Sequence, residues 1–207
     1  MPTSEQFRAL IQAIVSGAAQ PAAQMIRASP RLARVHAARG AVREAAREYF
    51  FPEILHYMYE GDTALHMAAA AYQGDVASAL ISSGADVRAK NRRGAEPLHY
   101  AADGGPGSAC WNPDSQATMI AGLIAAGADP NALDKSGVGP LHRAVRNRCA
   151  AAVKALLEGG ADPSAPNGKG STPLFLATRN TGRGGSGTPA AKIEQAEIVR
   201  LLEDAIR

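Results

Sequence analysis

The sequence predicts an all-α solenoid built from stacked helix-turn-helix units. A nine-residue phrase occurs four times along the chain, and a second, glycine-containing phrase keeps the same spacing. Of the 207 residues, 46% are hydrophobic and 20% are charged, which is typical of a folded globular chain. Repeats of this length form supersecondary units that stack and share one continuous core.

The first phrase reads GDTALHMAA, GAEPLHYAA, GVGPLHRAV and GSTPLFLAT, and it begins at Gly61, Gly94, Gly137 and Gly170. The steps between these glycines are 33, 43 and 33 residues, so the middle unit carries ten inserted residues. Thr63 and Thr172 can cap a helix with their hydroxyls, and proline is tolerated in the first helical turn. Each copy therefore predicts the start of a short helix.

The second phrase reads SGADV, AGADPNA and GADP, at residues 83–87, 126–132 and 160–163. Its glycines, Gly84, Gly127 and Gly160, suit the left-handed conformation in which many helices end. The Asp and Pro that follow favour a turn. We therefore expect a second helix in each unit to end here, with apolar residues such as Val153, Leu156 and Leu157 on its core face.

Together the two phrases resemble the ankyrin repeat, whose hallmarks are a Thr-Pro-Leu-His helix start and a Gly-Ala-Asp turn. The resemblance covers residues 61–207 and implies an ankyrin-repeat solenoid, with helix-turn-helix units joined by β-turn or hairpin loops. It divides this part of the chain into units 61–93, 94–136, 137–169 and 170–207. It also implies a non-enzymatic scaffold for protein–protein interaction, binding a protein or peptide through its concave face.

Residues 1–60 are expected to form a degenerate N-terminal cap. Phe7, Leu10, Ile11, Ile14 and Val15 have helical spacing, and a second helix is expected over residues 21–28. Residues 39–60 exceed the repeat length and hold five of the nine Phe and Tyr residues. We expect residues 42–51 of this aromatic-rich insertion to be helical.

Two further insertions, at residues 103–113 and 180–189, should emerge between the helices of the second and fourth units. Both are expected on one edge of the stack. Trp111 should order the first, whereas four glycines and no apolar anchor predict that residues 182–188 are mobile.

The resemblance also assigns the binding face and the repeated histidines. His66, His99 and His142 are expected to hydrogen-bond backbone between units rather than bind metal. The concave face carries the turn tips and the exposed ends of the first helices, with Asp62 on the same face of the first full unit. The partner-binding residues predicted there are Arg92, Arg93, Asp103, Lys135, Arg146, Asn147, Arg179 and Asn180. Because arginine forks suit carboxylates, we expect an acidic protein or peptide partner.

An alternative stays open: a small-molecule-binding protein or an unusual enzyme, with a pocket formed by the insertions and the aromatic N-terminal segment. The side chains that would line this pocket are Tyr57, Tyr59, Asp62, Tyr100 and Trp111. The sequence lacks GxSxG and HExxH motifs, so we expect no catalytic residues. Cys110 and Cys149 lack metal-ligand spacing, so we expect no metal and no cofactor.

Charge and hydropathy argue against three further classes of protein: nucleic-acid-binding, membrane-spanning and secreted. A net charge of +3 is too small to predict nucleic-acid binding. No apolar run is long enough to span a membrane, and the N-terminus does not resemble a secretory signal. We expect the two cysteines to be reduced thiols of a cytoplasmic protein, and we expect that protein to be a monomer.

Overall fold

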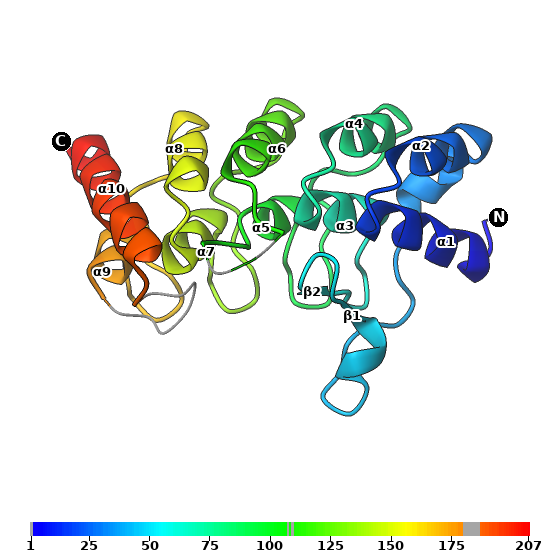
Figure 1. The fold of residues 1–207 in the computed structure, drawn as a ribbon, viewed down its shortest axis with the longest axis horizontal. Coiled ribbons are helices and arrows are strands. Elements are labelled where there is room, and N and C mark those ends of the chain that lie inside the picture. Colours follow the sequence, from blue (N-terminus) through cyan, green and yellow to red (C-terminus); the bar gives the residue numbers. More distant parts are fainter. Residues whose placement is uncertain (1, 107, 109, 180–186) are drawn as a thin grey trace.

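The computed structural model describes residues 2–106, 108, 110–179 and 187–207. These residues form ten α-helices, two short 3₁₀ helices and a two-stranded hairpin. Figure 1 shows the helices in two parallel layers along one axis, with the N-terminus at one end and the C-terminus at the other. The predicted all-α repeat solenoid is confirmed.

Each unit contributes one helix to each layer. The first helices are α1 (Ser4–Val15), α3 (Ala64–Ala70), α5 (Pro97–Ala101), α7 (Pro140–Asn147) and α9 (Pro173–Thr178). The second helices are α2 (Ala19–Ala28), α4 (Gly74–Ser82), α6 (Pro113–Ala125), α8 (Ala150–Glu158) and α10 (Pro189–Ile206). Successive units pack first helix on first helix and second helix on second helix.

The core runs through all units without a break. Leu65, Leu98 and Leu141 occupy the same repeat position and are buried. On α8, Leu156 is fully buried and Leu157 is half-buried, and this helix packs against both α6 and α10. The prediction that at least one of these two leucines lies between units is confirmed.

The turn tips between units are joined by backbone hydrogen bonds. Arg92 N–H donates to Glu60 O (2.8 Å), and Lys135 N–H donates to Arg93 O (2.9 Å). Gly168 N–H donates to Gly137 O (2.9 Å), which joins the last of these tips to the tip before it. Because each tip is bonded to its neighbour, the side chains they carry hold fixed relative positions.

The N-terminal cap follows the predicted helical stripe. Helix α1 begins at a capping box made by Thr3 and Gln6 and ends before Gly17, which has a φ of 76°. Helix α2 matches the predicted second helix. The 3₁₀ helix η1 (Pro30–Arg34) then leads the chain out of the cap.

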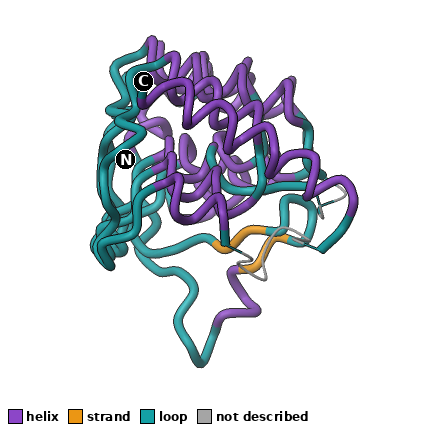
Figure 2. Tube along the Cα trace, turned by 90° about the vertical axis from the view of Figure 1, so that its left-hand side faces the viewer, coloured by secondary structure: helices purple, strands orange, loops and turns teal. Residues whose placement is uncertain are grey.

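The helix predicted over residues 42–51 is wrong. A 3₁₀ turn, η2 (Ala46–Tyr49), leads into strand β1 (Phe50–Phe51), which pairs antiparallel with β2 (His56–Tyr57). Met58 N–H donates to Tyr49 O and Ala41 N–H donates to Met58 O, so the backbone bonds that a helix would need are made with a distant segment. Tertiary pairing here overrides a weak local propensity. Figure 2 shows the hairpin below the helices and the loop before it projecting away as an arm.

The two later insertions differ in how far they can be described. The start of the first, at Asp103, Gly104 and Gly105, lies against helices of neighbouring units, as shown below. Residues 180–186 lie outside the described residues, and with them Asn180 and most of the stretch expected to be mobile. Over the described ranges, no helix is long and apolar enough to cross a membrane.

Candidate binding groove

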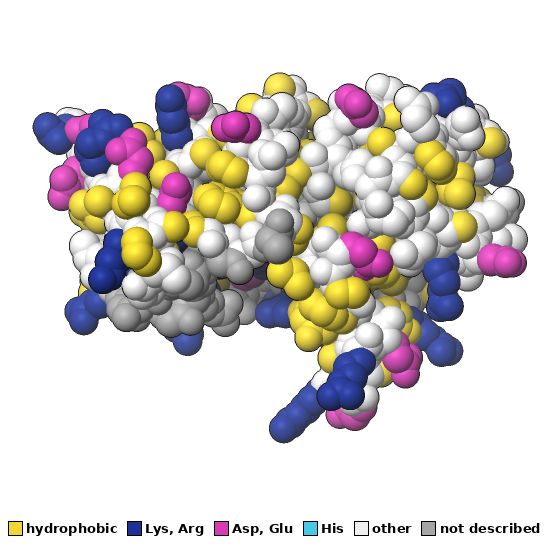
Figure 3. Space-filling model, in the orientation of Figure 1, with side chains coloured by type: hydrophobic (Ala, Val, Ile, Leu, Met, Phe, Trp, Pro, Cys, Tyr) yellow, Lys and Arg dark blue, Asp and Glu magenta, His cyan; other side chains and the backbone are white. Residues whose placement is uncertain are grey.

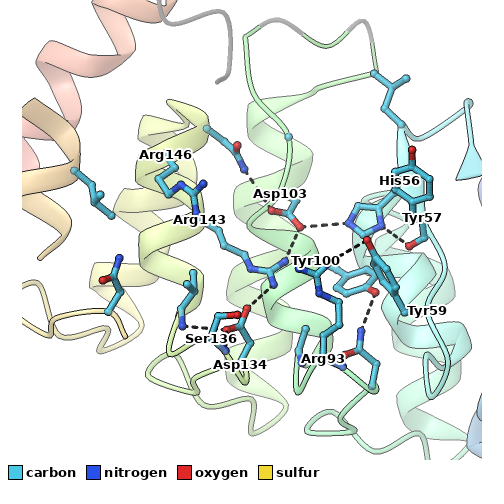
Figure 4. A pocket seen from close by; sticks show the side chains of 18 of the residues that line it. His56, Tyr57, Tyr59, Arg93, Tyr100, Asp103, Asp134, Ser136, Arg143 and Arg146 are labelled. Carbon is cyan, nitrogen blue, oxygen red and sulfur yellow. Dashed lines mark hydrogen bonds and ion pairs between the residues drawn. The ribbon is translucent and has the colours of Figure 1, made fainter. Parts of the chain in front are cut away.

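A groove of about 720 Å³ lies along the face formed by the first helices and the turn tips. Its floor includes Tyr100, Asp103 and Arg143, and the β1–β2 hairpin forms one wall with Leu55, His56, Tyr57 and Tyr59. Figure 4 shows the hairpin residues on one side of the floor and Arg146 on the other. The groove is therefore built by the repeats together with an element that is not part of them.

The centre of the floor is an arginine held between two aspartates. Arg143 Nη1 donates to Asp103 Oδ2 (2.8 Å) and Nη2 donates to Asp134 Oδ2 (3.0 Å). The three side chains are 16%, 27% and 7% exposed, respectively. We call this set the Asp–Arg–Asp bridge. It joins α7 to the end of α5 and to the turn tip that precedes α7.

Electrostatics inside the bridge keep all three groups charged. Burial alone would raise the pKa of Asp103, but the Arg143 charge and the hydrogen bond from His56 outweigh it and hold this pKa below its usual range. Burial would lower the pKa of Arg143, and the two carboxylates outweigh that effect and raise it. The bridge therefore carries a net charge of about −1 at neutral pH.

Side chains from three units hydrogen-bond to the backbone at and beside Asp103 and hold it in place. Tyr72 Oη donates to Asp103 O, and Gln116 Nε2 donates to Ala101 O (2.9 Å) and Asp103 O (3.0 Å). The buried Cys149 donates its thiol hydrogen to Gly104 O (2.6 Å), and burial raises the pKa of this thiol, so it remains protonated. Asp103 is thus positioned before any ligand arrives.

Close packing explains the glycines after Asp103. A Cβ atom at Gly105 would collide with the carbonyl oxygen of Asn147, at the end of α7. The insertion can therefore begin in contact with α7 only because glycine occupies this position.

The hairpin wall is attached to the floor through His56. Its Nε2 lies 3.3 Å from Asp103 Oδ2 and its Nδ1 lies 2.8 Å from Tyr57 O. Its ring packs against that of Tyr100 in a tilted arrangement, with 4.3 Å between the ring centroids. Tyr59 is flanked by Arg92 and Arg93, and Arg93 Nη1 donates to the Tyr59 hydroxyl (3.0 Å).

Asp62 was expected on the face that binds the partner, and this expectation is wrong. The structure places it beneath the hairpin wall, in a buried hydrogen-bond network. The Asp62 side chain is fully buried and accepts hydrogen bonds from Tyr100 Oη (2.7 Å), Asn91 Nδ2 (2.9 Å) and Tyr59 N–H (2.5 Å). Burial and the Asp62 charge raise the pKa of Tyr100 far above its usual value. Asp62, His66 and Tyr100 converge in this network, and of the three only Tyr100 also lines the groove.

The repeated histidines are structural, as predicted. In each, Nδ1 accepts a backbone N–H at the start of its own helix, so the ring hydrogen is on Nε2. Nε2 of His66 donates to Ala95 O and that of His99 to Val138 O, both in the next unit. His142 donates to Ala165 O, in the loop that leads to the last unit.

Two family models match the chain. One, described as ankyrin repeats (3 copies), matches residues 35–111, and the other, described as ankyrin repeats (many copies), matches residues 123–177. The chain belongs to the ankyrin-repeat family. Comparison with curated proteins gives no match. Ankyrin repeats generally mediate protein–protein interaction, and the family is typically non-enzymatic.

The ankyrin-repeat fold brings together only part of the predicted binding set. Arg93, Asp103, Arg146 and Asn147 line the groove. Asn147 Nδ2 also lies 3.4 Å from Asp103 Oδ1. These four residues come from three consecutive units: Arg93 from the turn tip that ends the first, Asp103 from the second, and Arg146 and Asn147 from the third.

The other predicted residues lie elsewhere. Arg92 donates to Ala41 O and lies over Tyr59. Arg179 lies over the Phe175 ring at 4.7 Å. Trp111 donates its indole N–H to Gln116 Oε1 (2.8 Å). Among the described residues, neither these three nor Lys135 belong to the groove lining.

Sequence reasoning missed Arg143, Asp134 and His56 as groove residues. Arg143 precedes Arg146 by three residues, which places both on one face of α7, so helical spacing could have found it. Asp134 occupies the same turn-tip position as Asn91 and Asn167, whose side chains likewise accept backbone N–H groups of their own tips. No local signal marks His56, because its position depends on the hairpin. In the part of the chain that the structure describes, no cluster of three or more His, Cys, Asp or Glu could hold a metal ion.

Proposed function

We propose that this ankyrin-repeat chain is a non-enzymatic scaffold that binds an acidic, extended segment of a partner protein in the groove. The observation that carries the proposal is the Asp–Arg–Asp bridge. Both carboxylates that line the groove are taken up by Arg143, while Arg93, Arg146 and Lys169 also line it.

The charge balance favours an anionic partner. The bridge leaves about one negative charge, and three further cations outweigh it, so the lining is positive overall at neutral pH. Arginine guanidinium groups bind carboxylates with paired hydrogen bonds, which supports Asp and Glu side chains as ligands. The positive lining would also speed association with an acidic segment at low salt.

The groove is also preorganised. Backbone hydrogen bonds join its turn tips to one another. The Asp–Arg–Asp bridge holds its floor together, and His56 attaches the hairpin wall to that floor. A binding surface that is already ordered loses less conformational entropy when the partner arrives.

Selection from a phage-displayed library of random peptides, each about 12 residues long, tests this proposal. We expect peptides enriched on the wild-type protein to carry an excess of Asp and Glu. Fluorescein-labelled copies of the enriched peptides, measured by fluorescence anisotropy, should bind more weakly at about 300 mM than at about 50 mM NaCl.

Charge reversal then locates the site. The groove variant Arg93→Glu, Arg146→Glu, Lys169→Glu should weaken binding of these peptides by about tenfold or more, since each lost ion pair is replaced by repulsion. The matched control reverses three exposed cations on the second helices: Arg27→Glu, Lys154→Glu and Lys192→Glu. It changes net charge equally and should leave affinity within about twofold, because these three residues do not line the groove.

A milder variant guards against misfolding of the first. Replacing the same three groove cations by Gln should weaken binding less than Glu does, with a thermal melt near that of the wild type. A selection that enriches no peptides, or peptides without excess acid, would contradict the proposal. Equal loss in the groove and control variants would contradict the assigned site.

The small-molecule or enzyme alternative has less support from the geometry. A cavity lined by Trp111 together with Tyr57 or Tyr59 would favour it. Tyr57, Tyr59 and Tyr100 do line the groove, but Trp111 does not, and Asp62 is buried. The first insertion contributes Asp103 and Gly104 to the lining, and residues 180–186 of the second lie outside the described residues.

A further inference from the structure

The turn of the β1–β2 hairpin holds a leucine in an unfavourable backbone conformation. Leu55 has a φ of 50°, in the left-handed region that favours glycine or asparagine, and its side chain is 52% exposed. It lines the groove. An exposed leucine contributes little to the core, so core packing does not account for its presence at this position.

The other described non-glycine residues with positive φ each make a buried or structural hydrogen bond. The Tyr72 hydroxyl donates to Asp103 O. Arg148 is fully buried and donates to the carbonyls of Val145 and Ala177. The Leu55 side chain cannot donate or accept a hydrogen bond. Strained residues of this kind concentrate at binding sites, where the surrounding structure fixes them.

Tyr57 extends the apolar surface that begins at Leu55. It is 38% exposed, lines the groove, and its ring packs against those of Phe50 (4.8 Å) and Tyr59 (6.4 Å). Figure 3 shows hydrophobic side chains gathered where the arm joins the repeats. Tyr57 is therefore held between two neighbouring aromatic rings.

His56 fixes both neighbours beside the floor. Because its ring packs against Tyr100 and its Nε2 contacts Asp103, Leu55 and Tyr57 flank a residue that is anchored at the centre of the groove. An apolar surface thus lies at the hairpin end, while Arg146 and Lys169 lie on the units toward the C-terminus.

We propose that Leu55 and Tyr57 form an apolar subsite for a hydrophobic side chain of the same partner segment whose acidic residues contact Arg146 and Lys169. This inference rests on the function proposed above and adds specificity to it. The groove then recognises a bipartite segment, with one apolar residue at the hairpin end and carboxylates toward the C-terminal units. The exposed side chain of Leu55 is then covered when the partner binds.

Substitution of Leu55 separates binding from folding. Leu55→Asn and Leu55→Gly suit the left-handed conformation, so the melting temperature should stay the same or rise. Binding of the enriched, fluorescein-labelled peptides should nevertheless weaken by about tenfold. Leu55→Met keeps the apolar side chain and should retain most of the affinity.

The matched control is Val42→Asn. Val42 is an exposed apolar residue of the same arm, at 39% exposure, and it does not line the groove. This variant should bind the peptides as the wild type does. Replacing the hydrophobic residue of the peptide by Ala should weaken binding to the wild type but add little further loss with Leu55→Asn.

The outcomes distinguish this inference from the function on which it rests. If Leu55→Asn binds normally while the charge-reversed groove variant does not, the apolar subsite is wrong and the acidic-segment groove stands. If the charge-reversed variant also binds normally, the proposed function fails. If Leu55→Asn loses both stability and binding, Leu55 is a structural residue and the inference is overturned.

Discussion

Arg143 and Asp103 lie 40 residues apart in sequence and form an ion pair at 2.8 Å across the boundary between two repeats. The same guanidinium reaches Asp134 at 3.0 Å, so one side chain of α7 pairs with a carboxylate at the end of α5 and with one at the turn tip that precedes α7. This contact sets the charge of the groove and links the packing of the units to their proposed binding function.

Removal of Arg143 should destabilise the fold most at neutral pH. In Arg143→Met two nearby carboxylates lose their shared partner, and we expect the free energy of unfolding to fall by about 1–3 kcal/mol, less than for a fully buried pair. The pKa of Asp103 is lower in the folded chain than in the unfolded chain, where it is about 3.9. The contribution of Asp103 to the free energy of unfolding is therefore present above about pH 3.9, and it is lost as the pH falls from there through the lower folded pKa.

Urea denaturation of wild type and Arg143→Met, at about pH 7 and at pH values from about 4 downward, measures this difference. The matched control is Arg88→Met, which removes an exposed pair with Asp129 and should cost less than about 1 kcal/mol. Equal losses in the two variants would argue against a special role for the bridge.

The repeated histidines should make stability fall under mildly acidic conditions. Burial lowers the pKa of His66 and His142, and it lowers that of His99 to about 4. The unfolded chain therefore binds more protons than the folded chain below about pH 6.5, and stability is lost as the pH falls from there through each folded pKa. Each neutral histidine contributes a slope approaching about 1.4 kcal/mol per pH unit in that range.

Urea denaturation across this pH range should show a smaller slope for His99→Gln than for the wild type. Glutamine can still donate a hydrogen bond toward Val138 O but cannot titrate. An identical slope in both proteins would show that His99 is not kept neutral by the fold.

Gly105→Ala should destabilise the protein although alanine is usually well tolerated. The added Cβ would collide with the Asn147 carbonyl, so we expect a loss of about 1–3 kcal/mol as the insertion shifts away from α7. The matched control is Gly122→Ala, in the middle of α6 with open space around its Cβ, which should stabilise by about 0.5–1 kcal/mol. Thermal melts that move in the same direction for both variants would refute the packing argument.

Leu156→Ala should be far more damaging than Leu157→Ala. Leu156 is fully buried where α8 meets its neighbours, so truncation should cost about 2–5 kcal/mol and loosen adjacent units. Leu157 is only half-buried and should cost less. Chemical denaturation measures the loss, and hydrogen exchange at α6 and α10 reports on the neighbours; negligible effects of both variants would contradict this account of the core.

The sequence by itself determined the repeats, their helix starts and ends, the cap helices α1 and α2, the buried leucines and the structural histidines. These features depend on a fixed period and on residues within one unit or at one repeated contact, so they leave a signal at constant spacing. The alternative of an accessible Asp62 came from the same spacing, which gives the position of a residue but not its burial.

Only the tertiary structure decided the groove. The Asp103–Arg143 pair joins two units whose spacing in the sequence is lengthened by ten inserted residues. His56 reaches the floor of the groove because β1 pairs with β2 instead of forming part of a helix. Leu55 enters the lining through the same hairpin. Such contacts depend on backbone bonds and packing between distant segments, and local propensity is too weak to specify them.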